Sequence, residues 1–364
     1  MTNTWAVLLA ACALSLLEAQ AQPKLPACSF YLFGMGERRK LLYKEGVLLD
    51  ARTGETVRKW EVARETIRPA EYSVRLELAG GGVVTISEDE KGVWLAEGGH
   101  KTSLAASRLK LPRFQGHSKA ALLRILHQEI LVNIVDGKPV PNLFVYSKPW
   151  YRDGALVCMC LQKTGNLRLV KDWILGLREP FDRNNAGQRE PDNLGEALYL
   201  ISLVSDASHP LVRTILDTIP QFRKGNYIVG STDFAEHPVY QTKWLKFGLR
   251  ALRLDDPYEI PAVFDSYSAL FWMDYKTAHV EGPGFSQEAR ELYPYLGWAE
   301  AHSHGWPPPM TVTEDRYPLT WEAQASQANY AGMGLVSEEY VQRRICAPHT
   351  WHAAEMFLYL LEQP

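Results

Sequence analysis

Carboxylate, arginine and aromatic side chains gather just before three strongly apolar segments of the chain. "KPWYRD" (148–153) precedes seven consecutive apolar residues, "REPDN" (189–193) precedes "LGEALYLISL", and "AEHPVYQ" (235–241) opens a third apolar segment. If each apolar segment is a helix buried on all sides, the three polar groups lie at the same end of their helices. We therefore expect them to meet at the mouth of one pocket.

These residue types suit the hydrolysis of glycosidic bonds, which needs a proton donor and a second carboxylate on either side of the sugar. Burial against Trp or Tyr raises the pKa of one carboxyl toward neutrality, and a cation such as Arg152 or Lys243 keeps the other ionised. The candidate catalytic residues are Glu190, Asp192, Asp153 and Glu236. The candidate sugar-binding residues are Trp150, Tyr151, Arg152, Asn193, His237, Tyr240, Lys243, Trp351 and His352.

A structural explanation competes for several of these residues. Asp153, Asp192 and Asn193 each stand where a helix begins, and short polar side chains there satisfy free N–H groups and complement the helix dipole. Capping needs only one such side chain, however, and does not call for Glu, Arg, Trp and Tyr around it. The grouping therefore favours a functional site, while the pairing of acid with base stays open.

Other polar stretches of the sequence give weaker evidence for a functional site. The loop "FDRNNAGQREPDNLG" could hydrogen-bond a glycan or could be a solvated loop. His302 and His304 lie beside three prolines and do not form a metal-binding pattern, and the chain has no EF-hand or zinc-ligand spacing. We expect no metal and no cofactor.

The elements that would position the site fall into two regions. Residues 28–112 show short segments with period-two alternation, broken by Gly80–Gly82, so 22–115 is expected to be a small antiparallel β domain. From Gly116 the period becomes helical, and helices apolar all round ("GALVCMCL") alternate with one-faced helices ("LRLVKDWILGL"). The predicted fold is mainly α: an α/α toroid over 116–364, preceded by the β domain.

The N-terminus has the features of an export signal. "WAVLLAACALSLL" is too short to span a bilayer, and Ala19-Gln20-Ala21 fits a signal-peptidase site. We expect a signal peptide over 1–21 and a secreted or periplasmic protein, with lipid anchoring at Cys12 less favoured. No later segment is a membrane-span candidate, and a net charge of −3 indicates no nucleic-acid partner.

The segments "WYRDGALVCMCLQKTGNLRLVKDWI", "EPDNLGEALYLISL" and "PHTWHAAEMFLYLL" together resemble six-hairpin (α/α)-toroid glycosidase-like proteins of secreted bacterial carbohydrate metabolism. The resemblance covers about 116–364 and implies a pocket with carboxylates at the N-terminal ends of inner helices. That role transfers to Asp153, Glu190, Asp192 and Glu236. Twelve helices normally need more chain than this region offers, so we expect a small or incomplete ring.

The leading hypothesis is a secreted hydrolase that cleaves an oligo- or polysaccharide with a carboxylate pair. One alternative is a polysaccharide lyase, in which Asn193, His237, Tyr240 and Arg152 would hold a uronate and abstract its proton. Another is a noncatalytic glycan-binding or envelope protein, since fold does not fix function. The sequence leaves the sugar, the linkage, the stereochemical outcome, the cysteine pairing and the oligomeric state open.

Overall fold

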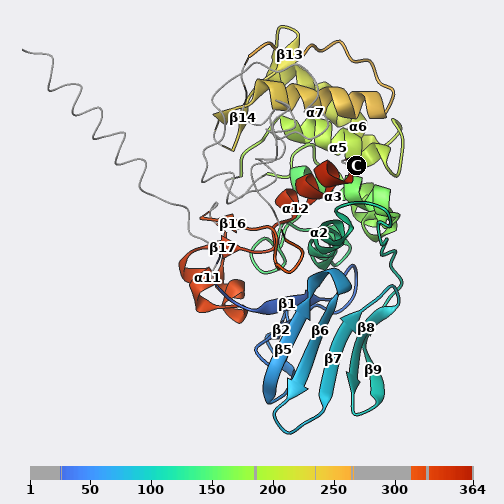
Figure 1. Cartoon of the computed structure of the whole chain (residues 1–364). Helices are drawn as coiled ribbons and strands as arrows, with labels where there is room; N and C mark the ends of the chain where they lie inside the picture. The colour runs from blue at the N-terminus through green and yellow to red at the C-terminus, as the bar shows by residue number, and fades with distance from the viewer. Residues whose placement is uncertain are drawn as a thin grey trace, which may run out of the picture.

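The computed structural model describes residues 25, 27–183, 187–233, 235–263, 265, 313–324 and 328–362. An antiparallel β region lies at one end of the molecule and most of the helices lie at the other (Figure 1). The expected signal peptide, Cys12, the loop residues 184–186, and His302 and His304 fall outside the described residues.

The β region contains two antiparallel sheets, each with its strands in sequence order. The first sheet consists of β1 (Phe30–Phe33), β2 (Leu41–Lys44), β3 (Val47–Asp50) and β4 (Thr56–Lys59). The second consists of β5 (Val62–Arg68), β6 (Ser73–Leu78), β7 (Val83–Glu88), β8 (Gly92–Glu97) and β9 (His100–Ala106). The turn between β6 and β7 uses Gly81 and Gly82 at positive φ, which glycine adopts without strain.

The two sheets pack face to face because alternate residues of each strand are apolar. In β6, Val74 and Leu76 are buried, while Arg75 and Glu77 between them are exposed. The shared core consists of Tyr31, Phe33, Leu41, Tyr43, Leu48, Val74, Leu76, Val84, Ile86, Val93 and Leu95. This β region is larger than the single small sheet or sandwich that the alternation suggested.

The opposite face of the first sheet packs on the helical region. Phe30, Leu32 and Leu42 belong to the main core together with apolar residues of α2 (Ala120–Val132). Gln128 of α2 donates a hydrogen bond from Nε2 to the carbonyl of Leu32 at 2.6 Å. The first sheet is therefore a middle layer between the second sheet and the helices.

Five helices pack side by side in the order α2, α12, α3, α5, α7. The last four span α12 (Thr350–Leu361), α3 (Tyr151–Thr164), α5 (Asp192–Ser202) and α7 (Pro238–Ala251). Gly195 and Gly248 allow α5 and α7 to touch through their backbones, since a Cβ on Gly195 would lie 2.2 Å from the Trp244 carbonyl carbon. Three of these helices, α12, α3 and α5, begin with polar residues that are buried.

The other elements of the described residues are short, and the counts that follow refer to these residues alone. Three helices have at most nine residues: α4 (Lys171–Leu175), α6 (Pro210–Thr218) and α11 (Glu338–Gln342). The 3-10 helices are η1 (Pro69–Glu71), η2 (Leu167–Leu169), η3 (Ile219–Phe222) and η5 (Ala331–Leu335). The two-stranded pairs are β10 (Ile134–Val135) with β11 (Lys138–Pro139), β12 (Arg223–Lys224) with β13 (Tyr227–Ile228), β14 (Ser231–Thr232) with β15 (Ala235–Glu236), and β16 (Glu322–Ala323) with β17 (Ile345–Cys346).

The prediction of a mainly-α toroid is wrong. The described residues form eight helices, but also seventeen strands in six sheets, with a large antiparallel region at the N-terminal side. The segments expected as outer helices do not all form long helices. Residues 167–175, expected as one helix, divide into η2 and the five-residue α4. The stretch between α6 and α7, for which no element was predicted, contains the hairpins β12–β13 and β14–β15. The turn of the first hairpin uses Gly225 at positive φ, a conformation that interrupts a helix.

Within the described residues, no helix is both long and apolar enough to cross a membrane. The cysteines of this part of the chain, Cys28, Cys158, Cys160 and Cys346, are all free thiols, and the last three are buried.

Candidate functional site

Arg152 is the centre of a buried acidic network. It lies in the first turn of α3 and is 7% exposed. Its Nε donates to Asp192 Oδ2 at 3.2 Å, its Nη2 to Glu190 Oε2 at 3.1 Å, and its Nη1 to Asp233 Oδ2 at 2.5 Å. The guanidinium thus joins the start of α3 to the start of α5 and to the β14–β15 turn. We call these four residues the Arg152 cluster.

Glu190 is a carboxyl of the cluster whose pKa is shifted toward neutrality. It is 3% exposed, and its Oε1 accepts a hydrogen bond from the backbone N–H of Asp233 at 2.9 Å. Burial raises the pKa of Glu190 to about 7, although the charge of Arg152 opposes the shift; the neighbouring Asp192 adds to it. Near neutral pH this carboxyl can therefore both hold and release a proton.

Asp192 and Asp233 have opposite surroundings. Asp192 is fully buried, and its Oδ1 accepts a hydrogen bond from Thr232 Oγ1 at 2.7 Å in addition to the bond from Arg152. Asp233 adopts a left-handed backbone (φ 47°), and its side chain is 43% exposed while it pairs with Arg152. The cluster therefore extends from the interior to the surface.

Behind the cluster lies a second layer of buried acids. Asn193 donates from Nδ2 to Glu196 Oε2 at 3.0 Å, and its Oδ1 accepts from the N–H of Asp182 at 3.2 Å. Burial, reinforced by Asp192, raises the pKa of Glu196 well above its usual value. Burial also raises the pKa of Tyr240 on α7, with the charge of Glu196 adding to the effect. Burial therefore favours the protonated, neutral forms of Glu196 and Tyr240.

On the other side of α3, Asp153 faces the start of α12. It is 1% exposed and accepts a hydrogen bond from Thr350 Oγ1 at 3.3 Å. Burial raises the pKa of Asp153 to about 6. Nε2 of His349 lies 3.1 Å from Oε2 of Glu322. Burial lowers the pKa of His349, but the Glu322 carboxylate outweighs this effect and raises it above its usual value.

One half-buried aromatic ring, that of Trp351, contacts the cluster, and a second, that of Trp150, lies at the start of α3. The ring of Trp351 lies 5.1 Å from the Arg152 guanidinium carbon, and Trp150 packs on Tyr146 with ring centroids 4.7 Å apart. Tyr151, by contrast, is buried, and its hydroxyl donates to the carbonyl of Glu179 at 2.7 Å. His352 is buried beside His349, with ring centroids 4.7 Å apart.

The structure brings together only part of the predicted site. Arg152, Glu190 and Asp192 are in direct contact, and Asn193 and Trp351 adjoin them. Asp153 lies next to Arg152 in the first turn of α3 but is bonded toward α12.

Of the predicted residues around α7, Tyr240 adjoins the second layer of acids behind the cluster, and Glu236, Lys243 and His237 have other surroundings. Glu236 is exposed on β15, and Lys243 is buried within α7. His237 Nδ1 lies 2.9 Å from Asp265 Oδ1, and the other Asp265 oxygen accepts from the N–H groups of Val239 and Tyr240. His237 therefore belongs to the capping of α7.

Thr232 and Glu196 were not among the residues predicted from the sequence. Asp182 was predicted only as a possible glycan contact in the loop before α5, and Asp233 only as one member of the polar stretch before α7, without a catalytic role. Asp233 stands three residues before Glu236 in the same polar stretch. Only the β14–β15 turn decides that the first of these two carboxylates points toward Arg152.

In the part of the chain that the structure describes, no group of three or more His, Cys, Asp or Glu side chains is placed to hold a metal ion. No protein-family model, no curated protein and no solved structure matches this chain.

Proposed function

We propose that this protein is a carbohydrate-active hydrolase in which Glu190 donates the proton to the leaving group. Asp233 would then be the second carboxylate. The observation that carries the proposal is that one guanidinium, that of Arg152, joins a buried carboxyl with a pKa of about 7 to a carboxylate that is open to solvent. Glycoside hydrolysis needs two carboxyl groups in such different environments.

The two carboxyl groups differ in the way that the reaction requires. A proton donor works best when its pKa lies near the working pH, as that of Glu190 does. Asp233 is exposed and bonded to Arg152, and both features favour its ionised form. Asp192 is fully buried and doubly hydrogen-bonded, so its role is to hold Arg152 in place. Trp150 and Trp351 supply flat, half-buried faces for the C–H surfaces of a sugar.

The lyase alternative fits less well. A lyase would need Arg152 to hold the carboxylate of a uronate, but its Nε, Nη1 and Nη2 already donate to three protein carboxylates. It would also need a basic Tyr240, whose raised pKa opposes loss of its proton.

The site of action in this proposal is outside the cytoplasm, with residues 1–21 as an export signal. The supporting feature is the apolar stretch that ends before Ala19-Gln20-Ala21. N-terminal sequencing of the protein recovered from its native cells tests this point. A chain that begins near Gln22 supports export, and an uncleaved N-terminus contradicts it.

The experiment is a screen of the full chain against poly- and oligosaccharides, with new reducing ends and the ultraviolet absorbance of unsaturated uronates read together. We expect reducing ends without absorbance. Glu190→Gln and Asp233→Asn should each lower the rate by at least about 100-fold. The control Asp217→Asn, in an exposed pair with Arg213 on α6, should not change it. Absorbance would favour a lyase, and glycan binding without any turnover would overturn the enzymatic proposal.

A further inference from the structure

A second candidate site lies at the other ends of α3 and α5. A surface hollow of about 420 Å³ is present there. It is lined by Leu167, Arg168, Lys171, Ser202, Leu203, Val204 and Ser205. Asp192 and Ser202 are the first and last residues of α5, so the hollow is about 15 Å from the Arg152 cluster along this helix alone.

The hollow is lined by apolar, hydroxyl-bearing and cationic side chains. Leu167, Leu203 and Val204 form a half-buried apolar part, and Ser202 and Ser205 add hydroxyl groups. The carbonyls at the end of α5 already accept hydrogen bonds: that of Tyr199 from Ser202 Oγ at 2.6 Å, that of Leu200 from the N–H of Leu203, and that of Ile201 from the N–H groups of Val204 and Ser205. The negative end of this helix is thus largely satisfied.

Two cationic side chains, those of Arg168 and Lys171, line the hollow, and further cations lie on the adjoining segments of the chain. We call Arg108, Lys110, Lys163, Arg168 and Lys171 the basic patch; all five are exposed. The Arg168 guanidinium donates to the carbonyl of Arg108. The backbone N–H of Lys110 donates to Asn166 Oδ1 at 3.0 Å, and the backbone carbonyl of Lys110 accepts from Asn166 Nδ2 at 2.7 Å. The backbone of the strand-to-helix connection is therefore fixed beside the end of α3.

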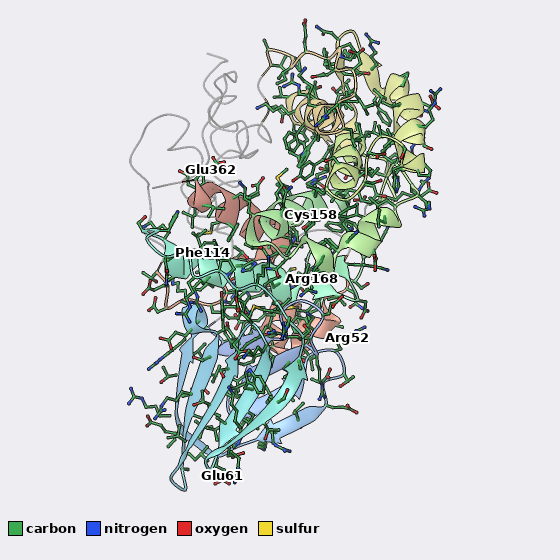
Figure 2. All side chains as sticks on the ribbon, turned by 90° about the vertical axis from the view of Figure 1, so that its right-hand side faces the viewer. Arg52, Glu61, Phe114, Cys158, Arg168 and Glu362 are labelled. Atoms are coloured by element: carbon green, nitrogen blue, oxygen red, sulfur yellow. The ribbon has the colours of Figure 1, made fainter. Side chains whose placement is uncertain are left out.

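Figure 2 looks onto this side of the molecule, where Arg168 lies below Cys158 of α3 and between the helices and the sheets. The chain also has two carboxylates next to lining residues: Asp172 follows Lys171, and Asp206 follows Ser205. Asp206 accepts hydrogen bonds from the N–H and the hydroxyl of Ser208 at 2.8 and 2.6 Å. A third exposed carboxylate, Glu90, accepts a hydrogen bond from the N–H of Leu111, next to Lys110. The five cations of the basic patch still outnumber these three carboxylates, so the surroundings of the hollow favour an anion.

We propose that this hollow binds an anionic saccharide, that is, a sugar unit bearing a carboxylate or a sulfate group. The anion pairs with Arg168, whose planar guanidinium suits two-oxygen groups, and with Lys171. The serine hydroxyls bond the sugar hydroxyls, and the apolar part contacts the C–H face of the ring. The volume lies within the range of small-molecule sites. The site is separate from the Arg152 cluster, and the proposal goes beyond hydrolysis because it holds whether or not the protein turns over a glycan.

Calorimetric titration of the full chain tests the proposal, with galacturonate oligomers, sulfated dextran oligomers and neutral malto-oligosaccharides as probes. Either anionic oligomer should bind, the tighter one identifying the preferred anion, and the neutral one should bind at least about tenfold more weakly. The double variant Arg168→Gln/Lys171→Gln should lose at least about tenfold in affinity. Its matched control is Arg58→Gln/Lys59→Gln on β4, which removes the same charge from an exposed strand.

A third variant tests the contribution of the hollow's shape separately from that of its cations. Ser205→Phe fills the hollow and removes no cation, so it should abolish binding of the anionic oligomers. Glu190→Gln should bind them as tightly as the native chain, which keeps this test apart from that of hydrolysis. Equal weakening by the β4 control, unchanged binding by Ser205→Phe, equal binding of the neutral oligomer, or no binding at all would each overturn the proposal.

Discussion

Nη2 of Arg152 and Oε2 of Glu190 lie 3.1 Å apart, and this contact joins the first turn of α3 to the residue pair that precedes α5. Both side chains are less than one-tenth exposed. Burial favours the neutral form of Glu190, and Arg152 favours its charged form, so the pKa of Glu190 settles at about 7. The contact is therefore both a structural link and the source of a carboxyl that titrates near neutrality.

Replacement of Arg152 by Met should destabilise the fold strongly. It would leave Glu190 and Asp192 buried without their cation, and loss of one partner from a buried ion pair typically costs about 3–5 kcal/mol. The matched control is Arg213→Met in the exposed pair with Asp217, for which we expect a change below about 0.5 kcal/mol. Urea unfolding measures both, and equal effects would show that the Arg152 cluster has no special role in stability.

A second buried acid should make the free energy of unfolding depend on pH. Glu129 of α2 accepts hydrogen bonds from the N–H of Leu319 and from Thr320 Oγ1, and burial raises its pKa from 4.5 to about 8 despite them. The folded state then holds this proton more tightly than the unfolded state. The stabilising contribution is complete below about pH 4.5 and is lost as the pH rises toward 8.

Glu129→Gln imitates the protonated acid, so its free energy of unfolding should fall less between pH 5 and pH 8 than that of the native chain. The difference in slope can reach roughly 1.4 kcal/mol per pH unit. Denaturant titrations at several pH values measure it, with Glu71→Gln on exposed η1 as the control. Identical slopes in the native chain and in Glu129→Gln would contradict a raised pKa at this position.

The contact between α5 and α7 should not tolerate a methyl group. An added Cβ on Gly195 would lie 2.2 Å from the carbonyl carbon of Trp244, so the helices would have to separate. We expect Gly195→Ala to cost at least about 2 kcal/mol, although alanine favours helix by about 1 kcal/mol. Gly80→Ala, where no atom lies within 4 Å, should change stability by less than about 0.5 kcal/mol. Thermal unfolding compares the two, and a neutral Gly195→Ala would refute the close contact.

The sequence predicted features that depend on local periodicity or on helix starts. Period-two alternation located β6, where Val74 and Leu76 are buried. The polar groups before α3 and α5 were expected to meet, and Arg152 does contact Glu190 and Asp192. The first result follows because successive side chains of a strand face opposite sides of the sheet. The second follows because charged side chains buried at the starts of α3 and α5 need partners of opposite charge, and each helix start supplies the other's.

The remaining features depend on tertiary structure. Helical periodicity in 167–177 did not reveal that the segment would divide into η2 and α4, and the hairpins before α7 depend on turns at Gly225 and Asp233. The toroid prediction failed because α4 is short and because the described residues contain seventeen strands in six sheets. Asp233 was predicted as a member of the polar stretch before α7 but not as a partner of Arg152, because their contact spans 81 residues and depends on the turn after β14. No local pattern encodes such a contact.

The pH dependence of kcat/KM for hydrolysis of the best saccharide substrate tests the central claim most directly. If Glu190 is the proton donor, the rate should be high below its pKa of about 7 and fall about tenfold per pH unit above it. In Glu190→Gln the rate should be low, without this alkaline limb, while Asp217→Asn should keep the native profile. A native rate that stays constant from pH 6 to pH 9, or a Glu190→Gln variant with the native rate and profile, would contradict the assignment.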